Sequence, residues 1–154
     1  MKKFVHVLFA LIVALTAVSC DNKNKEDNGD KLVIDGKTRE IAHKAYYQYS
    51  DGTGVRYQFM VMSPSCHVTM NISEYWIGKT IPLDTRSEKS WDVCCAGSEE
   101  IPIFMGADNT SVGMRKGSTL KVERVGDNFK LTLQADDGSH TIYCTAKGFE
   151  FQPN

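Results

Sequence analysis

Apolar and polar residues alternate one by one along several stretches of this chain, and this alternation restricts the fold more than any other feature. The clearest stretches are residues 55–61, 68–72 and 129–133. Successive side chains of a β-strand point to opposite faces, so a period of two marks a strand with one buried face. Between residues 31 and 154, no stretch of eleven or more residues has the period of an amphipathic helix. The alternation therefore predicts an all-β domain.

The turns between these stretches set the expected architecture. Asp35-Gly36, residues 50–54, residues 126–128 and residues 136–139 are rich in the residue types that favour turns. About eight or nine strands at a spacing of roughly 8–12 residues are typical of an antiparallel β-sandwich or a small β-barrel. We expect strands at residues 32–34, 41–49, 55–61, 68–72, 91–95, 101–105, 120–122, 129–133 and 142–146.

Two segments interrupt this pattern. Ser73 has a residue type that caps helices and Gly78 one that ends them, so the residues between them are expected to form a single helical turn. Residues 107–117 have no periodicity, and we expect a loop there.

The N-terminus has a different character. Lys2 and Lys3 precede an apolar run over residues 4–18 that only His6 and Thr16 interrupt. A membrane-spanning helix needs about twenty apolar residues. A shorter run behind basic residues is typical of a signal peptide. We therefore expect residues 1–19 to be removed on export.

The residues at the end of this run indicate a lipid anchor. Ala17-Val18-Ser19-Cys20 resembles the lipobox of bacterial lipoproteins, although Ala17 stands where the box usually has Leu. The resemblance implies that Cys20 receives a diacylglyceryl group and becomes the first residue of the mature protein. The alternative is cleavage by an ordinary signal peptidase, which would leave an odd number of cysteines in the secreted domain.

The segment behind Cys20 is suited to a tether. Residues 21–30 contain no apolar side chain, so we expect residues 20–30 to form a lipidated and disordered linker before a domain at 31–154. Lys25-Glu26-Asp27 resembles the signal that sends lipoproteins of the Bacteroidetes to the outer surface, and a generic charged linker is the alternative. The expected location is the outer membrane, attached by lipid, with exposure at the cell surface as one possibility.

Composition excludes some classes of function. Lys and Arg number 18 and Asp and Glu number 19, a formal charge of −1 that argues against a nucleic-acid partner. The sequence has no Gly-rich phosphate loop, no G-x-S-x-G and no H-E-x-x-H motif. We therefore expect no cofactor and no catalytic residue.

A wider resemblance covers nearly the whole chain. Besides the anchor and linker, it rests on residues 35–37, residues 77–83 and the hairpin at 117–129. These segments resemble those of Bacteroidetes lipoproteins that carry one small β domain behind the lipid. The resemblance implies a fold and a location, and it assigns no activity or site residue.

Four cysteines remain in the domain. Cys95 shares the apolar phase of its strand, and so does Cys144, so we predict a Cys95–Cys144 disulfide. By elimination, Cys66–Cys94 would be the second disulfide. The alternatives are free buried thiols, a Cys94–Cys95 disulfide that acts as a redox switch or ligand platform, and a zinc or copper site that includes His67. The sequence has no C-x₂-C pair, so no metal is expected.

Tyr75 and Trp76 are the strongest candidates for partner contact. They lie in the expected helical turn, where they either plug the core or form an exposed aromatic surface. His43, His67 and His140 are expected to be ordinary exposed side chains. Asp136-Asp137 lacks the remaining ligands of a calcium loop, so the pair is expected to form a hairpin turn.

Two functions fit these expectations. The first is a non-catalytic interaction or structural module that a lipid holds at the membrane, with another surface protein or a glycan as its partner. The second is a binder or carrier of a small apolar or glycan ligand, held in a barrel lumen or on an aromatic face. A packed interior would disfavour carriage in a lumen.

Overall fold

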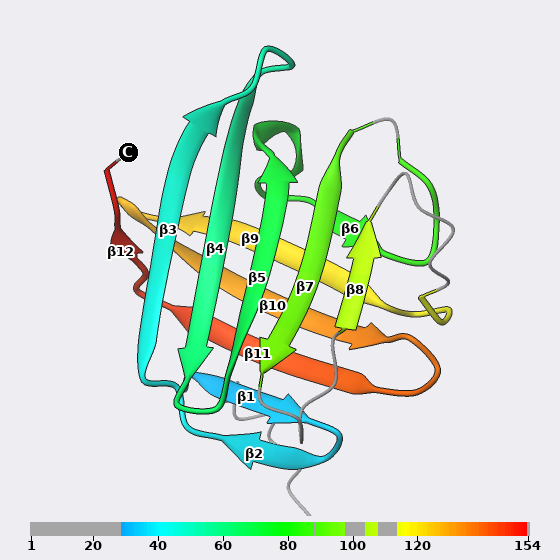
Figure 1. Ribbon diagram of the computed structural model, residues 1–154. Helices are drawn as coiled ribbons and strands as arrows, with labels where there is room; N and C mark the ends of the chain where they lie inside the picture. Colours follow the sequence, from blue (N-terminus) through cyan, green and yellow to red (C-terminus); the bar gives the residue numbers. More distant parts are fainter. Residues whose placement is uncertain (1–28, 88, 98–103, 108–113, 154) are drawn as a thin grey trace, which may run out of the picture.

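The computed structural model describes residues 29–87, 89–97, 104–107 and 114–153. Within these residues, strands form two sheets that pack face to face as a β-sandwich and do not close into a barrel. The strands of the two sheets run across one another (Figure 1). The expected signal peptide, Cys20 and most of the expected tether lie outside the described residues.

The first sheet, here called sheet A, has six antiparallel strands. Their order is β2-β1-β11-β10-β9-β6. The strands are β1 (Lys31–Ile34), β2 (Lys37–Arg39), β6 (Thr80–Pro82), β9 (Thr119–Val125), β10 (Asn128–Asp136) and β11 (Thr141–Lys147). β9, β10 and β11 form the expected meander, and β1 joins its edge.

The second sheet, sheet B, also has six strands, in the order β12-β3-β4-β5-β7-β8. The pairs are antiparallel except that the terminal strand β12 lies parallel to β3. The strands are β3 (His43–Ser50), β4 (Val55–Ser63), β5 (Cys66–Ser73), β7 (Trp91–Gly97), β8 (Phe104–Ala107) and β12 (Glu150–Phe151). The 3₁₀ turn η1 (Glu74–Trp76) follows β5, and the hydroxyl of its N-cap Ser73 accepts a hydrogen bond from Tyr75 N.

One continuous core fills the space between the sheets. It takes alternate residues from the strands of both layers, which is why the period of two predicted those strands correctly. Phe129 of sheet A packs edge to face against Phe59 of sheet B at 5.1 Å. The largest fully buried side chains are Trp91, Phe59, Phe129, Phe149, Leu32, Met70, Ile72, Ile81, Leu120, Leu131 and Leu133.

The sandwich has more strands than the sequence predicted. The additional strands β2, β6 and β12 have two or three residues each, too few to display a period. The expected strand at 101–105 overlaps β8, but residues 101–103 lie outside the described part, as does most of the loop expected at 107–117. The expected helical turn after Ser73 is confirmed. In the described part of the chain, no helix is long and apolar enough to cross a membrane.

Candidate functional site

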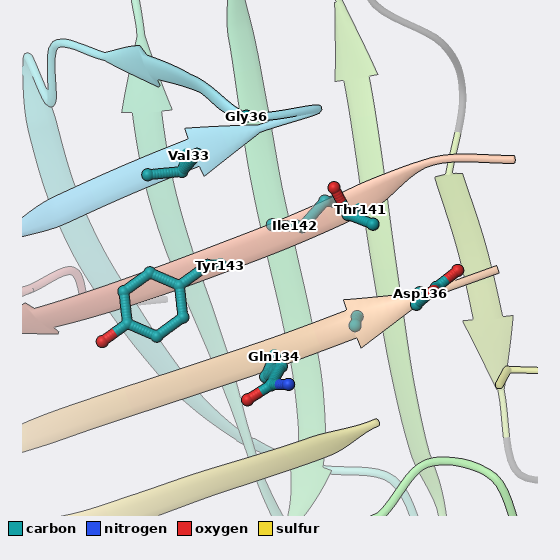
Figure 2. Close-up of a pocket in the computed structure, with 8 residues that line it drawn as sticks. Val33, Gly36, Gln134, Asp136, Thr141, Ile142 and Tyr143 are labelled. Atoms are coloured by element: carbon teal, nitrogen blue, oxygen red, sulfur yellow. The ribbon is translucent and has the colours of Figure 1, made fainter. Parts of the chain in front are cut away.

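A shallow groove lies on the outer face of sheet A, where β1, β10 and β11 run side by side (Figure 2). Its volume is about 410 Å³, within the roughly 300–1,000 Å³ that is usual for small-ligand pockets. Ala135 and Ile142 line its floor and are themselves buried, because they belong to the inward phase of their strands. The other residues that line it are Val33, Gly36, Gln134, Asp136, Thr141 and Tyr143.

Strand register brings these outward residues together. Tyr143 stands directly between Val33 of β1 and Gln134 of β10, so the three side chains form one row across the sheet. Thr141 and Asp136 form the next outward pair. Tyr143 is 39% exposed, and its ring projects from the sheet beside Gln134 (Figure 2). Gly36 also lines the groove, and it contributes no side chain.

The turn between β1 and β2 builds one wall. Asp35 and Gly36 both have positive φ, 50° and 74°, as a two-residue type I′ hairpin requires. Asp35 Oδ1 accepts a hydrogen bond of 2.8 Å from Thr141 N, and Asp35 Oδ2 lies 3.1 Å from His140 Nδ1. The Thr141 hydrogen bond, with a smaller effect of His140, holds the pKa of Asp35 below its usual 3.8. This hairpin is therefore fastened to the start of β11.

The turn between β10 and β11 lies at the same end of the groove, beside the β1–β2 hairpin. The Asp137 carboxylate accepts hydrogen bonds from Ser139 N and His140 N, and the Asp136 carboxylate accepts one of 2.7 Å from Gly138 N. Arg115 Nε lies 3.8 Å from Asp136 Oδ1. Asp136-Asp137 thus forms the hairpin turn that the sequence predicted. An ionised carboxylate offers about four acceptor positions, so Asp136 can also accept from a ligand.

The groove combines a flat ring with acceptors at its edges. Tyr143 offers an apolar face and a hydroxyl, and Gln134 offers an amide that both donates and accepts. With Thr141 and Asp136, the lining is suited to a ligand that has apolar faces and many hydroxyl groups. The sequence prediction missed this site, although Tyr143 lies out of phase with the buried Ile142 and Cys144 and was therefore recognisable as an outward aromatic residue.

The cysteines have the predicted orientation but not the predicted disulfides. Cys95 and Cys144 are buried and Cys94 is half-buried, as the alternation indicated. The four cysteines of the described residues are nevertheless free, so neither Cys95–Cys144 nor Cys66–Cys94 is formed. A Cys66–Cys94 disulfide conflicts with the register, because Cys66 faces inward and Cys94 outward on neighbouring strands.

Cys66 instead lies beside Cys95. Cys66 pairs with Gly97, two residues beyond Cys95, so both thiols occupy the inward face of sheet B and form a side-chain hydrogen bond with each other. Burial, with smaller effects of Cys66 and Cys94, raises the pKa of Cys95 to about 12. Burial also raises the pKa of Cys144 to about 12 and, with Asp92 nearby, raises that of Cys94.

The sequence left open whether Tyr75 and Trp76 plug the core or form an exposed surface, and the two residues differ in this respect. Trp76 packs against the core, and its Nε1 donates a hydrogen bond of 3.2 Å to Lys89 O. Tyr75 is 50% exposed, with the Lys79 ammonium 3.3 Å from its ring centroid. Because this ammonium covers one face of the ring, Tyr75 offers less stacking surface than its exposure suggests. Its role in partner contact stays a prediction.

The described ranges contain no cluster of three or more His, Cys, Asp and Glu side chains placed to hold an ion. His43 and His67 are exposed, and His140 is occupied by Asp35.

Comparison with known proteins finds no matching protein-family model, no matching curated protein and no matching solved structure.

Proposed function

We propose that this chain is an exported, lipid-anchored protein whose β-sandwich binds a partner without catalysis. The groove on the outer face of sheet A is the contact site, and a glycan is the partner. The single observation that carries this proposal is the groove itself, in which Tyr143 stands between Val33 and Gln134 with Asp136 at the rim. Export and anchoring rest on the signal-peptide pattern and on Cys20.

The packing of the interior favours binding at the surface. The core cluster joins residues of both sheets, and aromatic rings from the two layers contact one another within it. Side chains thus occupy the space in which a barrel would carry a ligand. Carriage in a lumen is therefore disfavoured, and binding on an aromatic face is retained.

The lining favours a sugar over an apolar ligand. Apolar sugar faces stack on exposed aromatic rings, and sugar hydroxyls can donate to the Asp136 carboxylate and the Gln134 amide oxygen. The groove is open along the sheet, which suits a segment of a chain. A purely apolar ligand would cover these polar groups without giving them hydrogen-bond partners, which costs binding free energy.

A binding experiment with two tyrosine variants tests the proposal. The full chain with Cys20→Ser is titrated calorimetrically with soluble oligosaccharides of hexose and N-acetylhexosamine units. We expect at least one to bind, and Tyr143→Ala to weaken the binding by at least roughly 5-fold, because truncation of a contact residue that matters typically costs more than about 1 kcal/mol. Tyr75→Ala is the matched control, since it removes an exposed tyrosine elsewhere. An equal loss of affinity in both variants, or a loss of affinity only in Tyr75→Ala, would show that the groove is not the binding site.

The anchor has a test of its own. In cells that export the chain, Cys20→Ser should move the protein from the membrane fraction to the soluble fraction, because acyl chains supply about 0.8 kcal/mol per buried CH₂. Protease added to intact cells should digest the wild-type protein if it faces outward. A wild-type chain in the soluble fraction would contradict lipid anchoring.

A further inference from the structure

Three side chains with soft donor atoms form a row across the outer face of sheet B. Met62 of β4 is the direct register partner of both His43 on β3 and His67 on β5. Their neighbours Val61 and Val68 are fully buried, so the phase of these strands directs Met62 and His67 outward. The row is therefore His-Met-His on three adjacent strands.

The row is open to solvent and borders a hollow. His43 and His67 are exposed, and Met62 is 36% exposed. Met62 and His67 both line a hollow of about 360 Å³ around the turn between β4 and β5. Among the described residues of β7, the small residues Ala96 and Gly97 line this hollow.

The strand register allows these three side chains to bind one ion together. Direct cross-strand neighbours have Cβ atoms about 4.5–5.5 Å apart, so two imidazoles that flank a thioether can reach one ion between them. Glu150 Oε2 lies 3.9 Å from His43 Nδ1. At this distance the carboxylate does not hydrogen-bond to the ring, but it places a negative charge beside the row, which favours a cation.

We propose that His43, Met62 and His67 bind one cuprous ion. Thioether sulfur selects Cu(I), and imidazole is a good copper ligand. Ca²⁺ and Mg²⁺ require several oxygen ligands, which this row lacks, and structural zinc sites have four His or Cys ligands. The metal-ligand cluster absent from the described residues is one of His, Cys, Asp and Glu. The third donor here is a methionine, which lies outside that set.

A competition titration tests the site. The full chain with Cys20→Ser is titrated without oxygen into the coloured Cu(I) complex of bicinchoninate, and loss of colour reports transfer of copper to the protein. We expect one equivalent to transfer to the wild-type row. Met62→Leu and His67→Asn should each lower the affinity for Cu(I) by at least roughly 10- to 100-fold. That is the loss expected when a residue that only supports a metal ligand is removed.

Two control variants separate this site from the thiols and from a general effect of methionine. Met60→Leu changes the same residue type on the same strand and face, but Met60 pairs with Ala45 and Thr69 and not with histidine, so we expect unchanged affinity. Cys66→Ser should also leave the affinity unchanged, although the free Cys66 thiol lines the same hollow as Met62 and His67. Met62→Leu conserves volume at an exposed position, so its melting temperature should equal that of the wild type. Wild-type affinity in Met62→Leu, or loss of binding in Cys66→Ser, would overturn the proposal.

Discussion

Asp35 is the residue that fastens the groove together. Its carboxylate accepts a hydrogen bond from Thr141 N and faces His140 Nδ1, and its own N–H donates to Thr141 O at 3.0 Å. It also occupies the first position of the type I′ turn with φ of 50°. One side chain therefore sets the distance between the β1–β2 hairpin and the start of β11.

The lowered pKa of Asp35 predicts how stability depends on pH. A carboxyl group whose folded pKa lies below its unfolded value stabilises the fold above the unfolded value, here near 3.8, and loses that effect as pH falls through the folded pKa. Asp35→Asn should therefore have a lower urea midpoint than the wild type near neutral pH. The difference should shrink as pH falls well below 3.8. A difference that does not change with pH would contradict this account.

The inward thiols predict which disulfide forms on oxidation. Cys66 and Cys95 share a face and a hydrogen bond, whereas Cys94 faces the other way. Oxidised glutathione accepts two electrons and the two thiol protons, which yields two molecules of reduced glutathione, and a Cys66–Cys95 disulfide should be the product. Cys94 and Cys95 are adjacent and share a peptide, so peptide mapping by mass spectrometry without reductant is run on the wild type and on Cys94→Ser, which should keep the linked peptides. A Cys66–Cys94 or Cys95–Cys144 peptide would show that the register does not control the pairing.

At the scale of elements, the sequence predicted the long strands well. Period-two alternation in β4, β5 and β10 reflects burial of one face, and this physical cause acts within each strand. β2, β6 and β12 were missed because two or three residues are too few to display a period. The groove was missed for a different reason, since Val33, Gln134 and Tyr143 meet only through the register of three strands. The predicted disulfides are not formed, because strand alternation shows on which face of the sheet a cysteine lies but not which cysteine lies next to it.

The β1–β2 hairpin allows a direct test of turn geometry. Gly36 has φ of 74°, and a Cβ placed there would meet no atom within 4 Å, so a substitution acts through backbone conformation alone. Gly36→Ala should lower the free energy of unfolding by about 1–2 kcal/mol. Gly36→Asn should cost less, because asparagine enters this region more readily. Urea denaturation measures both, and equal losses would contradict the assignment.

At the scale of the whole molecule, the contact between the sheets holds the sandwich together. Phe129 packs against Tyr46, Tyr57 and Phe59 of the opposite sheet with centroids 5.0–5.4 Å apart. Phe129→Ala should lower the free energy of unfolding by about 3–5 kcal/mol, and Phe129→Leu by less. Val125→Ala on the exposed end of β9 should change it by less than about 0.5 kcal/mol. A small effect of both Phe129 variants would mean that the layers do not depend on this cluster.

The proposed glycan site on the outer face of sheet A can be mapped residue by residue. The measurement is the change in backbone amide chemical shifts of the protein during titration with an oligosaccharide that binds it. We predict shifts concentrated at Val33, Gly36, Gln134, Thr141 and Tyr143, around the groove of Figure 2. Shifts concentrated at Tyr75 and Trp76, or on the outer face of sheet B, would contradict it.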